Sequence, residues 1–414
     1  MKLIKHIILI AFLWISPRIS PAQESLNVMF YNLLEFPEAP PANRPAILKN
    51  ILDSYNPDLF MVCELESEQG ANTILNTALQ TADNRYARAK FVSNQSHPPT
   101  DLQQLVFYNK NKFILDGQEI ITTNIRDINH YKFRLNTTGE PVYLDAFVAH
   151  LKSSSGTDNE EKRLDMVLDF TTYLLNIPKD HFVIFAGDLN LYTSEEDAYQ
   201  ELLDPTNAIP LIDPINKPGN WHNNSSFAAI HTQSSRRKND DFDGFGAGGG
   251  IDDRFDFILL SKNFETASTL KYVPGSYDAY GNNRNCFDKN INDKKCTGNY
   301  SQSLRDNLYL MSDHLPVILQ LETNASLSVA DENLVKEMVQ FTEGNIIQNR
   351  LRLKTNNRLL NGKISVYNQL GQTISTQTIT KKNIEIDATN MSPGIYFLTI
   401  QHEQTRFSLK FIKI

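Results

Sequence analysis

Apolar segments that end in acidic, amide or imidazole side chains recur along the first three quarters of the chain. Their lengths and their content of β-branched and aromatic residues predict strands over residues 25–32, 58–64, 104–109, 142–150, 181–188, 254–260 and 314–321. Apolar residues at helical spacing predict helices over residues 45–55 and 160–175, the second with Leu164, Val167, Leu168 and Leu175 on one face. Such a mixture favours sheets covered by helices, an α/β or α+β class.

The polar residues at these strands form a second pattern. Most lie at a strand edge, and one interrupts a strand: the edge residues are Asn32, Glu64, His150, Asp188 with Asn190, and Asp313 with His314, and the interrupting residue is Asp256. A carboxylate beside buried apolar residues costs free energy unless it is paired or binds a cation. We therefore predict that these side chains meet in one functional site.

The residue types suit a metal-dependent phosphodiesterase. Oxygen ligands from Glu64, Asp313 and the amide of Asn32 fit a hard cation, Mg²⁺ or Mn²⁺. Aspartate together with histidine also fits zinc, but the sequence has neither a set of cysteine ligands nor an HExxH motif. Magnesium or manganese is therefore the first expectation and zinc the second.

The remaining polar residues fit the catalytic roles of such an enzyme. We expect Asp188 with Asn190 to orient the attacking water, and His150 and His314 to donate hydrogen bonds to phosphate oxygens. Asp256 would hold the imidazole of His314 in one tautomer. The sequence alone does not tell which histidine is the acid and which the base.

These segments, in order, resemble the endonuclease/exonuclease/phosphatase superfamily over residues 24–323. The motifs are Phe30-Tyr-Asn32, Val62-Cys-Glu64, Val148-Ala-His150-Leu, Phe185-Ala-Gly-Asp188-Leu-Asn190, Arg254-Phe-Asp256-Phe and Ser312-Asp313-His314-Leu-Pro. The resemblance implies a DNase I-like four-layer α/β/β/α sandwich, in which two mixed sheets pack face to face with helices outside. It also implies one metal-dependent site that cleaves phosphoesters at the strand ends, with the metal-site and catalytic residues named above.

Within that superfamily the substrates range from DNA and RNA to phosphoinositides and sphingomyelin, and the fold does not choose among them. Residues 222–238 contain histidines and a basic run, so we predict that His231 and Arg236 contact substrate. The alternative is a solvated loop. Trp221, just before this segment, would stack on a base or simply pack in the interior.

Two further segments surround the predicted strand 254–260. Residues 240–253 are acidic and rich in glycine, which predicts a mobile loop near the active site, with a structural Ca²⁺ site as the alternative. Residues 275–309 form a tyrosine-rich insertion that we expect at the rim of the site. It contains Cys286 and Cys296, ten residues apart in a polar loop, which we predict to form a disulfide. Cys63 lies in an apolar strand and is expected to be a buried core residue.

The two ends of the chain predict export. Residues 1–22 have a basic start, an apolar stretch and small residues before position 23, which is typical of a signal peptide. The catalytic domain is expected over 23–323 and a linker over 324–340. Residues 341–414 contain short alternating strands between turn residues and resemble the C-terminal sorting domain of the type IX secretion system. The alternative for this antiparallel β sandwich is a carbohydrate-binding or adhesion module.

The charge distribution limits how the chain contacts a polyanion. The net charge is −8, and residues 23–324 alone carry −15, which argues against a broad basic nucleic-acid surface but is compatible with metal-bridged attack on a phosphodiester. The sequence thus predicts a secreted or surface-attached, monomeric nuclease without transmembrane segments. Its expected partners are DNA or RNA and the type IX secretion machinery. The alternatives are a hydrolase acting on lipid or small phosphorylated substrates and, less favoured, a noncatalytic surface binding protein.

Overall fold

The architecture comes from a computed structural model, which describes residues 24–414 except 83, 98–99, 138, 326, 328–337 and 403–404. The predicted signal peptide and most of the predicted linker lie outside the described residues. Within the described residues, no helix has the length and apolar character required to cross a membrane.

The first sheet has seven strands, in the order β11-β13-β1-β2-β4-β3 with β12 paired to β13. Their bounds are β1 Glu24–Phe36, β2 Leu59–Leu65, β3 Tyr86–Arg88, β4 Gln103–Asn109, β11 Leu270–Tyr272, β12 Asp278–Ala279 and β13 Val317–Thr323. The central strand β1 runs parallel to β2 and antiparallel to β13, so the sheet is mixed. The parallel pair brings the carboxyl ends of β1 and β2 to the same edge.

The second sheet has six strands, in the order β5-β6-β7-β8-β10-β9. Their bounds are β5 Phe113–Ile121, β6 Ile128–Leu135, β7 Tyr143–His150, β8 Phe182–Asp188, β9 Leu211–Ile212 and β10 Asp256–Ser261. Here β7 and β8 are the parallel pair, and His150 is directly opposite Asp188 in their register. Contacts of β1 and β2 with β7, β8 and β10 join the two sheets face to face.

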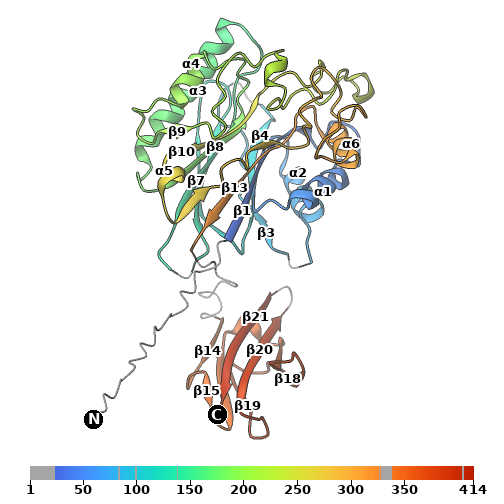
Figure 1. Cartoon of the computed structure of the whole chain (residues 1–414). Coiled ribbons are helices and arrows are strands. Elements are labelled where there is room, and N and C mark those ends of the chain that lie inside the picture. Colours follow the sequence, from blue (N-terminus) through green and yellow to red (C-terminus); the bar gives the residue numbers. More distant parts are fainter. Residues whose placement is uncertain are drawn as a thin grey trace, which may run out of the picture.

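Helices cover the outer faces of both sheets, which confirms the predicted four-layer sandwich (Figure 1). One outer layer contains α1 Arg44–Tyr55, α2 Glu68–Thr73 and α6 Gln302–Met311, and the other contains α3 Thr157–Tyr173 and α4 Asp197–Leu202. A short helix, α5 Asn263–Thr266, follows β10. Apolar side chains of both sheets form the main core, and a second cluster fills the space between the second sheet and α3.

Helix α3 buries a different face from the one predicted. Leu168 and Leu175 are 41% and 74% exposed, whereas Arg163 is completely buried. The Arg163 guanidinium donates to Glu196 at 2.7 Å, and this pairing allows a charged residue to occupy the centre of the buried stripe. Hydrophobic periodicity cannot anticipate a buried arginine, so the predicted face was rotated by about one residue.

Other differences concern strand positions. The hairpin of β5 and β6 was not predicted, because β5 is an edge strand with Asp116, Gly117 and Glu119 among its apolar residues. Strand β10 begins at Asp256, so this aspartate starts a strand rather than interrupting one. Strand β13 begins at Val317, which leaves Asp313 and His314 on the segment between α6 and β13.

The C-terminal residues form the predicted β sandwich. A three-stranded sheet contains β14 Val339–Phe341, β16 Arg350–Thr355 and β19 Asn383–Asp387. A five-stranded sheet contains β15 Ile346–Ile347, β21 Thr405–Lys413, β20 Gly394–His402, β17 Lys363–Asn368 and β18 Thr373–Thr378, in that order. Apolar residues of both sheets, among them Leu351, Val366 and Leu398, form a separate core.

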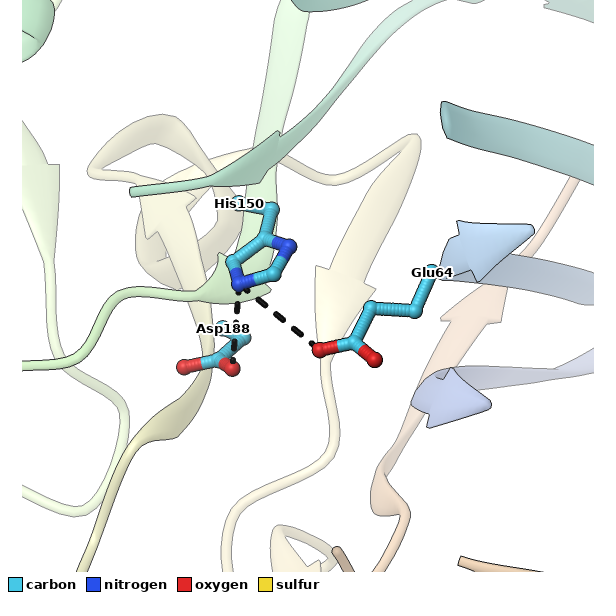
Figure 2. Close-up of side chains that lie close together, drawn as sticks. All are labelled: Glu64, His150 and Asp188. Atoms are coloured by element: carbon cyan, nitrogen blue, oxygen red, sulfur yellow. Dashed lines mark ion pairs between the residues drawn. The ribbon is translucent and has the colours of Figure 1, made fainter. Parts of the chain in front are cut away.

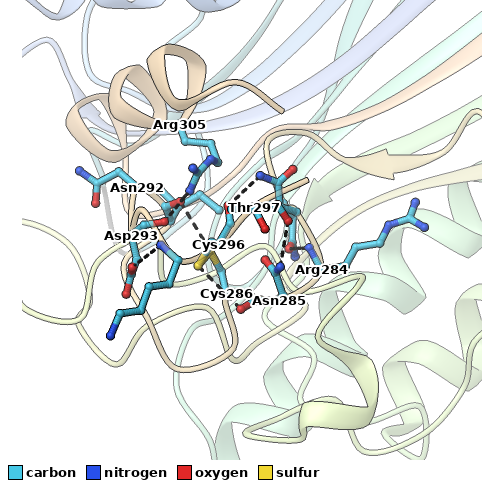
Figure 3. Close-up of a disulfide and its surroundings, with 12 residues drawn as sticks. Arg284, Asn285, Cys286, Asn292, Asp293, Cys296, Thr297 and Arg305 are labelled. Carbon is cyan, nitrogen blue, oxygen red and sulfur yellow. Dashed lines mark hydrogen bonds between the residues drawn. A yellow bond between two sulfur atoms is a disulfide. The ribbon is translucent and has the colours of Figure 1, made fainter. Parts of the chain in front are cut away.

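The insertion before α6 contains a disulfide between Cys286 and Cys296 (Figure 3). Arg305 of α6 donates to the main-chain oxygens of Ile291 and Asp293, at 2.7 and 2.9 Å, and so ties the loop to the helix. The loop also pairs with the segment that precedes β10, through a hydrogen bond of 2.8 Å from Ile291 N to Ser235 O. The insertion therefore supports residues 231–251 from one side.

Removing this disulfide is expected to lower the free energy of unfolding by about 3 kcal/mol, because the cross-link between residues ten apart restricts the unfolded chain. Urea unfolding of a Cys286→Ala, Cys296→Ala double variant measures the change. Wild-type protein treated with dithiothreitol should unfold like the variant, and dithiothreitol should leave the variant unchanged. Equal stability of the oxidised wild type and the double variant would contradict the prediction.

Candidate active site

The carboxyl ends of the central strands bring polar side chains together between the two sheets. These are Asn32 from β1, Glu64 from β2, His150 from β7 and Asp188 from β8, joined by Asp256 at the start of β10 and by Asp313 and His314 before β13. Within the described residues, two groups of three side chains have ligand atoms close enough to share a metal ion. Both groups contain Asp188, so they form one continuous centre.

The first group is Glu64, His150 and Asp188 (Figure 2). His150 Nε2 lies 3.8 Å from Glu64 Oε1 and 3.6 Å from Asp188 Oδ2, so the imidazole nitrogen faces both carboxylates. The glycine at 187 helps to place Asp188, because a Cβ atom there would lie 2.3 Å from the main-chain oxygen of Ala149. Glycine thus allows β8 to approach β7 closely where both strands end.

The second group is Asp188, Asp256 and His314. His314 Nδ1 and Asp256 Oδ2 are 2.8 Å apart, and His314 Nε2 lies 3.6 Å from Asp188 Oδ2. The hydrogen bond to Asp256 fixes the imidazole so that Nε2 points to the centre. This is the arrangement that the sequence predicted for Asp256 and His314.

Asn32 links the two groups, but in a different way from the one predicted. Its Nδ2 donates to Glu64 Oε1 at 2.8 Å and to Asp188 Oδ2 at 3.0 Å, while its Oδ1 accepts from Leu34 N at 3.0 Å. The amide nitrogen, rather than the oxygen expected for a metal ligand, therefore faces the carboxylates. In this orientation Asn32 holds the two acids in place.

Asp313 lies at the side of the centre and belongs to neither group of three. Its Oδ2 accepts from Ala247 N at 2.7 Å and from Gln233 Nε2 at 3.2 Å. Gly246 adopts a φ of +80°, and a Cβ at this position would lie 2.9 Å from Asp313 Cγ. The glycine-rich segment thus packs directly on Asp313, which places it at the active site.

Burial and mutual repulsion change the pKa values of the acids. Burial raises the pKa of Asp188 to about 7, although His314 lowers it. Burial and Asp313 also raise the pKa of Glu64. Asp188 can therefore gain and lose a proton near neutral pH, as a general base must.

The two histidines differ in charge. Burial lowers the pKa of His150 well below its ordinary value, and Arg126 and His314 lower it further. Burial also lowers the pKa of His314, but Asp256, Asp188 and Asp313 outweigh it and raise the pKa well above the ordinary value. The centre thus combines a neutral imidazole with a cationic one.

The donor set fits a divalent cation. Two buried carboxylate oxygens, Asp256 Oδ1 and Asp313 Oδ1, have no hydrogen-bond donor among the described residues. A buried carboxylate oxygen without a partner is costly, and a cation would satisfy it. Glu64 adds a further oxygen ligand. Carboxylates suit Mg²⁺ or Mn²⁺, and the two histidines keep zinc compatible.

Arg126 is a site residue that the sequence did not indicate. Its Nη1 donates to the main-chain oxygens of His150 and Leu151, at 3.3 and 2.9 Å. Burial lowers its pKa, whereas Glu64 and Asp188 raise it, so the guanidinium is within electrostatic range of these two carboxylates. Arg126 is in the loop between β5 and β6. Its place in the site could have been predicted only if the β5–β6 hairpin had been predicted from the sequence.

Left-handed backbone conformations mark the two strand ends that carry acids. Asn190 has a φ of 51°, and its main-chain nitrogen donates to Asp188 Oδ1 at 3.2 Å. Its side chain donates to Leu151 O at 3.4 Å, so it braces the end of β8 against the end of β7. Glu64 has a φ of 56°, which is uncommon for a glutamate. This conformation turns its carboxylate toward Asn32 and away from the path of β2.

The residues predicted to contact substrate from segment 222–238 are not exposed. His231 is completely buried and donates from Nε2 to Trp221 O at 2.9 Å. Arg236 is also completely buried, donates to the main-chain oxygens of Tyr309 and Leu310, and stacks on Phe242. Their burial rules out direct substrate contact in this structure, and both serve to hold the loop.

Two other predictions concern Trp221 and the glycine-rich segment 240–253. Trp221 is fully buried against Tyr199 and Phe257, so it packs in the interior and does not stack on a base. The carboxylates of residues 240–253, all of them described, form no group of three ligand side chains. The alternative of a Ca²⁺ site in this segment therefore gains no support.

Comparisons with known proteins address the fold and the family. Residues 29–314 match the model of the "Endonuclease/Exonuclease/phosphatase family", and residues 345–414 match that of the "Secretion system C-terminal sorting domain". No curated protein matches the sequence significantly.

Several solved structures are similar to the larger domain over most of its length. D. rerio TDP2 complexed with single-strand DNA product is 18% identical, with 72% of this chain and 99% of that chain covered at a TM-score of 0.48. An endonuclease/exonuclease/phosphatase from Bacteroides vulgatus is 15% identical, with 72% and 99% covered at 0.47. The Bacteroides thetaiotaomicron mannosyl-6-phosphatase Bt3783 is 14% identical, with 72% and 99% covered at 0.43. Similarity at this level carries no information about the substrate.

Proposed function

The chain belongs to the endonuclease/exonuclease/phosphatase family, and from this premise we propose that it is a divalent-metal-dependent nuclease that hydrolyses extracellular nucleic acid. As a member of this family it is a phosphoester hydrolase. Its C-terminal sorting domain indicates export and a cell-surface or secreted location, and implies an interaction with the type IX secretion machinery. We further propose that residues 1–22 are its signal peptide and that the mature enzyme acts as a monomer.

The observation that carries the proposal is the convergence of Glu64, His150, Asp188, Asp256 and His314 in one centre. A bound divalent ion would be held by Glu64 and by Asp313, whose Oδ1 has no hydrogen-bond donor among the described residues, and would supply Lewis-acid stabilisation of phosphate charge. Asp188 accepts a proton from the attacking water, for which a pKa of about 7 is well matched. The new phosphorus–oxygen bond then forms as the bond to the leaving oxygen breaks.

The histidines and Arg126 stabilise the charge that develops on the phosphate. The cationic His314, oriented by Asp256, donates from Nε2 to a phosphate oxygen. The Arg126 guanidinium provides a second positive charge beside Glu64 and Asp188. His150 faces the same acids as a neutral imidazole and can donate a hydrogen bond to a phosphate oxygen, whereas the cationic His314 can give its proton to the leaving oxygen. In an otherwise acidic domain, these local contacts replace a broad basic surface.

Metal removal tests the proposal. Purified protein is expected to cleave plasmid DNA or RNA with Mg²⁺ or Mn²⁺, to lose this activity completely in EDTA, and to regain it when excess Mn²⁺ is added. EDTA already saturated with Mn²⁺ is the control and should leave cleavage unchanged.

Other products would point to other functions. Intact nucleic acid together with release of free phosphate from small phosphomonoesters would identify a phosphatase. Hydrolysis of sphingomyelin vesicles with no action on nucleic acid would identify a lipid phosphodiesterase. No metal-dependent turnover on any of these substrates would favour a binding protein.

A further inference from the structure

The C-terminal end of helix α6 leads directly into the catalytic residues, and two buried arginines bind its main-chain oxygens. The last main-chain oxygens of an α-helix have no partner within the helix. Arg236 donates from Nε to Tyr309 O at 2.9 Å and from Nη2 to Leu310 O at 3.3 Å. Arg44 donates from Nε to Met311 O at 2.9 Å. Two guanidinium groups from distant parts of the chain thus fix where α6 ends.

The charge of these arginines suits the end of a helix. Both side chains are buried, and their hydrogen bonds go to main-chain oxygens rather than to carboxylates. Burying a cation without a carboxylate partner costs free energy. The negative end of the α6 dipole offsets part of that cost, but only while the helix ends beside the guanidinium groups. The arginines and the end of α6 therefore hold each other in place.

Arg236 belongs to the segment that also contacts Asp313. Ser235 N donates to Asp313 O at 2.7 Å, and Ala247 N donates to Asp313 Oδ2 at 2.7 Å. Between these two contacts in the sequence, Phe242 packs against the Arg236 guanidinium, whose carbon lies 3.4 Å from the ring centroid. Residues 235–247 thus bind the end of α6 through Arg236 and bind Asp313 through main-chain nitrogens. Arg236 therefore joins α6 to the segment that holds Asp313.

The position of Asp313 determines how it can bind a metal ion. Its Oδ2 accepts hydrogen bonds from Ala247 and Gln233, whereas its buried Oδ1 has no donor among the described residues and is the oxygen left for an ion. His314 has a separate anchor, the hydrogen bond of 2.8 Å between its Nδ1 and Asp256 Oδ2. A shift at the end of α6 is therefore expected to move Asp313 more than the imidazole of His314.

We propose that Arg236 is a positioning residue for the divalent ion: it fixes the end of α6 against residues 235–247 and so keeps Asp313 Oδ1 directed at the ion. The inference rests on the proposed metal dependence, and it gives Arg236 no contact with substrate and no proton to transfer. Groups that orient a metal ligand commonly change metal affinity by about tenfold to a hundredfold when they are replaced. Loss of Arg236 should therefore weaken metal binding much more than it slows the chemical step.

Mn²⁺ titration of the full chain tests the proposal without any substrate. In calorimetry, Arg236→Met is expected to bind Mn²⁺ with a Kd about tenfold above that of wild type, because methionine leaves two oxygens at the end of α6 without donors. Arg236→Lys keeps the charge but lacks the planar fork that binds two oxygens, so its Kd should lie between the two. With bis(4-nitrophenyl) phosphate as substrate, saturating Mn²⁺ should restore the kcat of Arg236→Met to near the wild-type value.

The matched control is Arg305→Met. Arg305 is another buried arginine that donates to main-chain oxygens, those of Ile291 and Asp293, so this variant should bind Mn²⁺ as tightly as wild type. Wild-type affinity in a folded Arg236→Met would overturn the inference, and so would an equal loss of affinity in Arg305→Met. If Arg236→Met does not fold, the titration of Arg236→Lys decides, and wild-type affinity in that variant would overturn the inference. Absence of Mn²⁺ binding in the wild type would instead refute the proposed metal dependence, and the inference with it.

Discussion

Replacing Asp188 by asparagine is expected to lower kcat by about a thousandfold while the protein remains folded. The side chain lies where the two groups of the centre meet, and asparagine cannot accept the proton from the attacking water. The folded protein should become more stable at pH 8. Burial raises the pKa of Asp188 to about 7, above its value in the unfolded chain, so its ionisation destabilises the folded state as the pH rises toward 7. Asparagine removes this cost.

Steady-state kinetics on a phosphodiester, together with thermal unfolding at pH 8, measure both effects. Asp180→Asn is the matched control, because Asp180 is exposed and lies just before the start of β8, at the opposite end of this strand from Asp188. It should change neither activity nor stability by more than a small amount. If Asp188→Asn keeps more than a tenth of the wild-type kcat, the result contradicts the assignment of Asp188 as the general base. A large activity loss with a lower unfolding temperature would indicate a structural role instead.

Replacing Arg254 by methionine is expected to cost about 3 to 5 kcal/mol in the free energy of unfolding. Arg254 is buried, and its Nη1 and Nη2 donate to the two oxygens of Asp213 at 2.8 and 2.9 Å. The guanidinium also stacks over Phe257, 4.0 Å from the ring centroid. Methionine retains much of the packing but leaves the carboxylate of Asp213 buried without its cation. Since Asp256 follows by two residues, activity should fall as well.

Urea unfolding measures this change. The control is Arg134→Met, which breaks an exposed pair with Asp116 and should cost less than about 1 kcal/mol. A double variant that combines Arg254→Met with Asp213→Leu should recover part of the lost stability, because it no longer contains the buried, unpaired carboxylate of Asp213. A cost in Arg254→Met no greater than in the control would mean that this buried pair contributes little to stability.

The strands and helices that could be predicted are those marked by a pattern of neighbouring residues in the sequence. Apolar runs such as residues 59–65 and 182–188 are completely or almost completely buried strands, so the sequence reveals them directly. Strand β5 mixes Asp116, Gly117 and Glu119 with apolar residues, because an edge strand needs no continuous apolar face. The buried face of α3 depends on the pairing of Arg163 with Glu196, which are 33 residues apart. Contacts of that kind are not encoded in any local pattern.

The same distinction applies to the active site. A polar residue at the end of an apolar strand is a local signal, and it identified the side chains that meet at Asp188. Arg126 and Gln233 reach the centre from loops, where no periodicity marks them. Arg236 looked like a phosphate contact because arginine usually lies at the surface, yet main-chain oxygens and Phe242 hold it in the interior. Sequence patterns thus found the acids but could not distinguish an arginine near the centre from one that holds a loop in the interior.

The left-handed backbone at Glu64 has a consequence for directed evolution of this enzyme. At a φ of 56°, glycine would relieve a cost of about 1 kcal/mol that glutamate bears. It would also remove a buried carboxylate whose pKa is raised by burial and by Asp313. A selection that rewards only thermal tolerance would therefore tend to discard Glu64 early, and with it the activity. Libraries screened for thermal stability need a simultaneous screen for turnover. At this position the residue that gives the highest stability differs from the residue that activity requires.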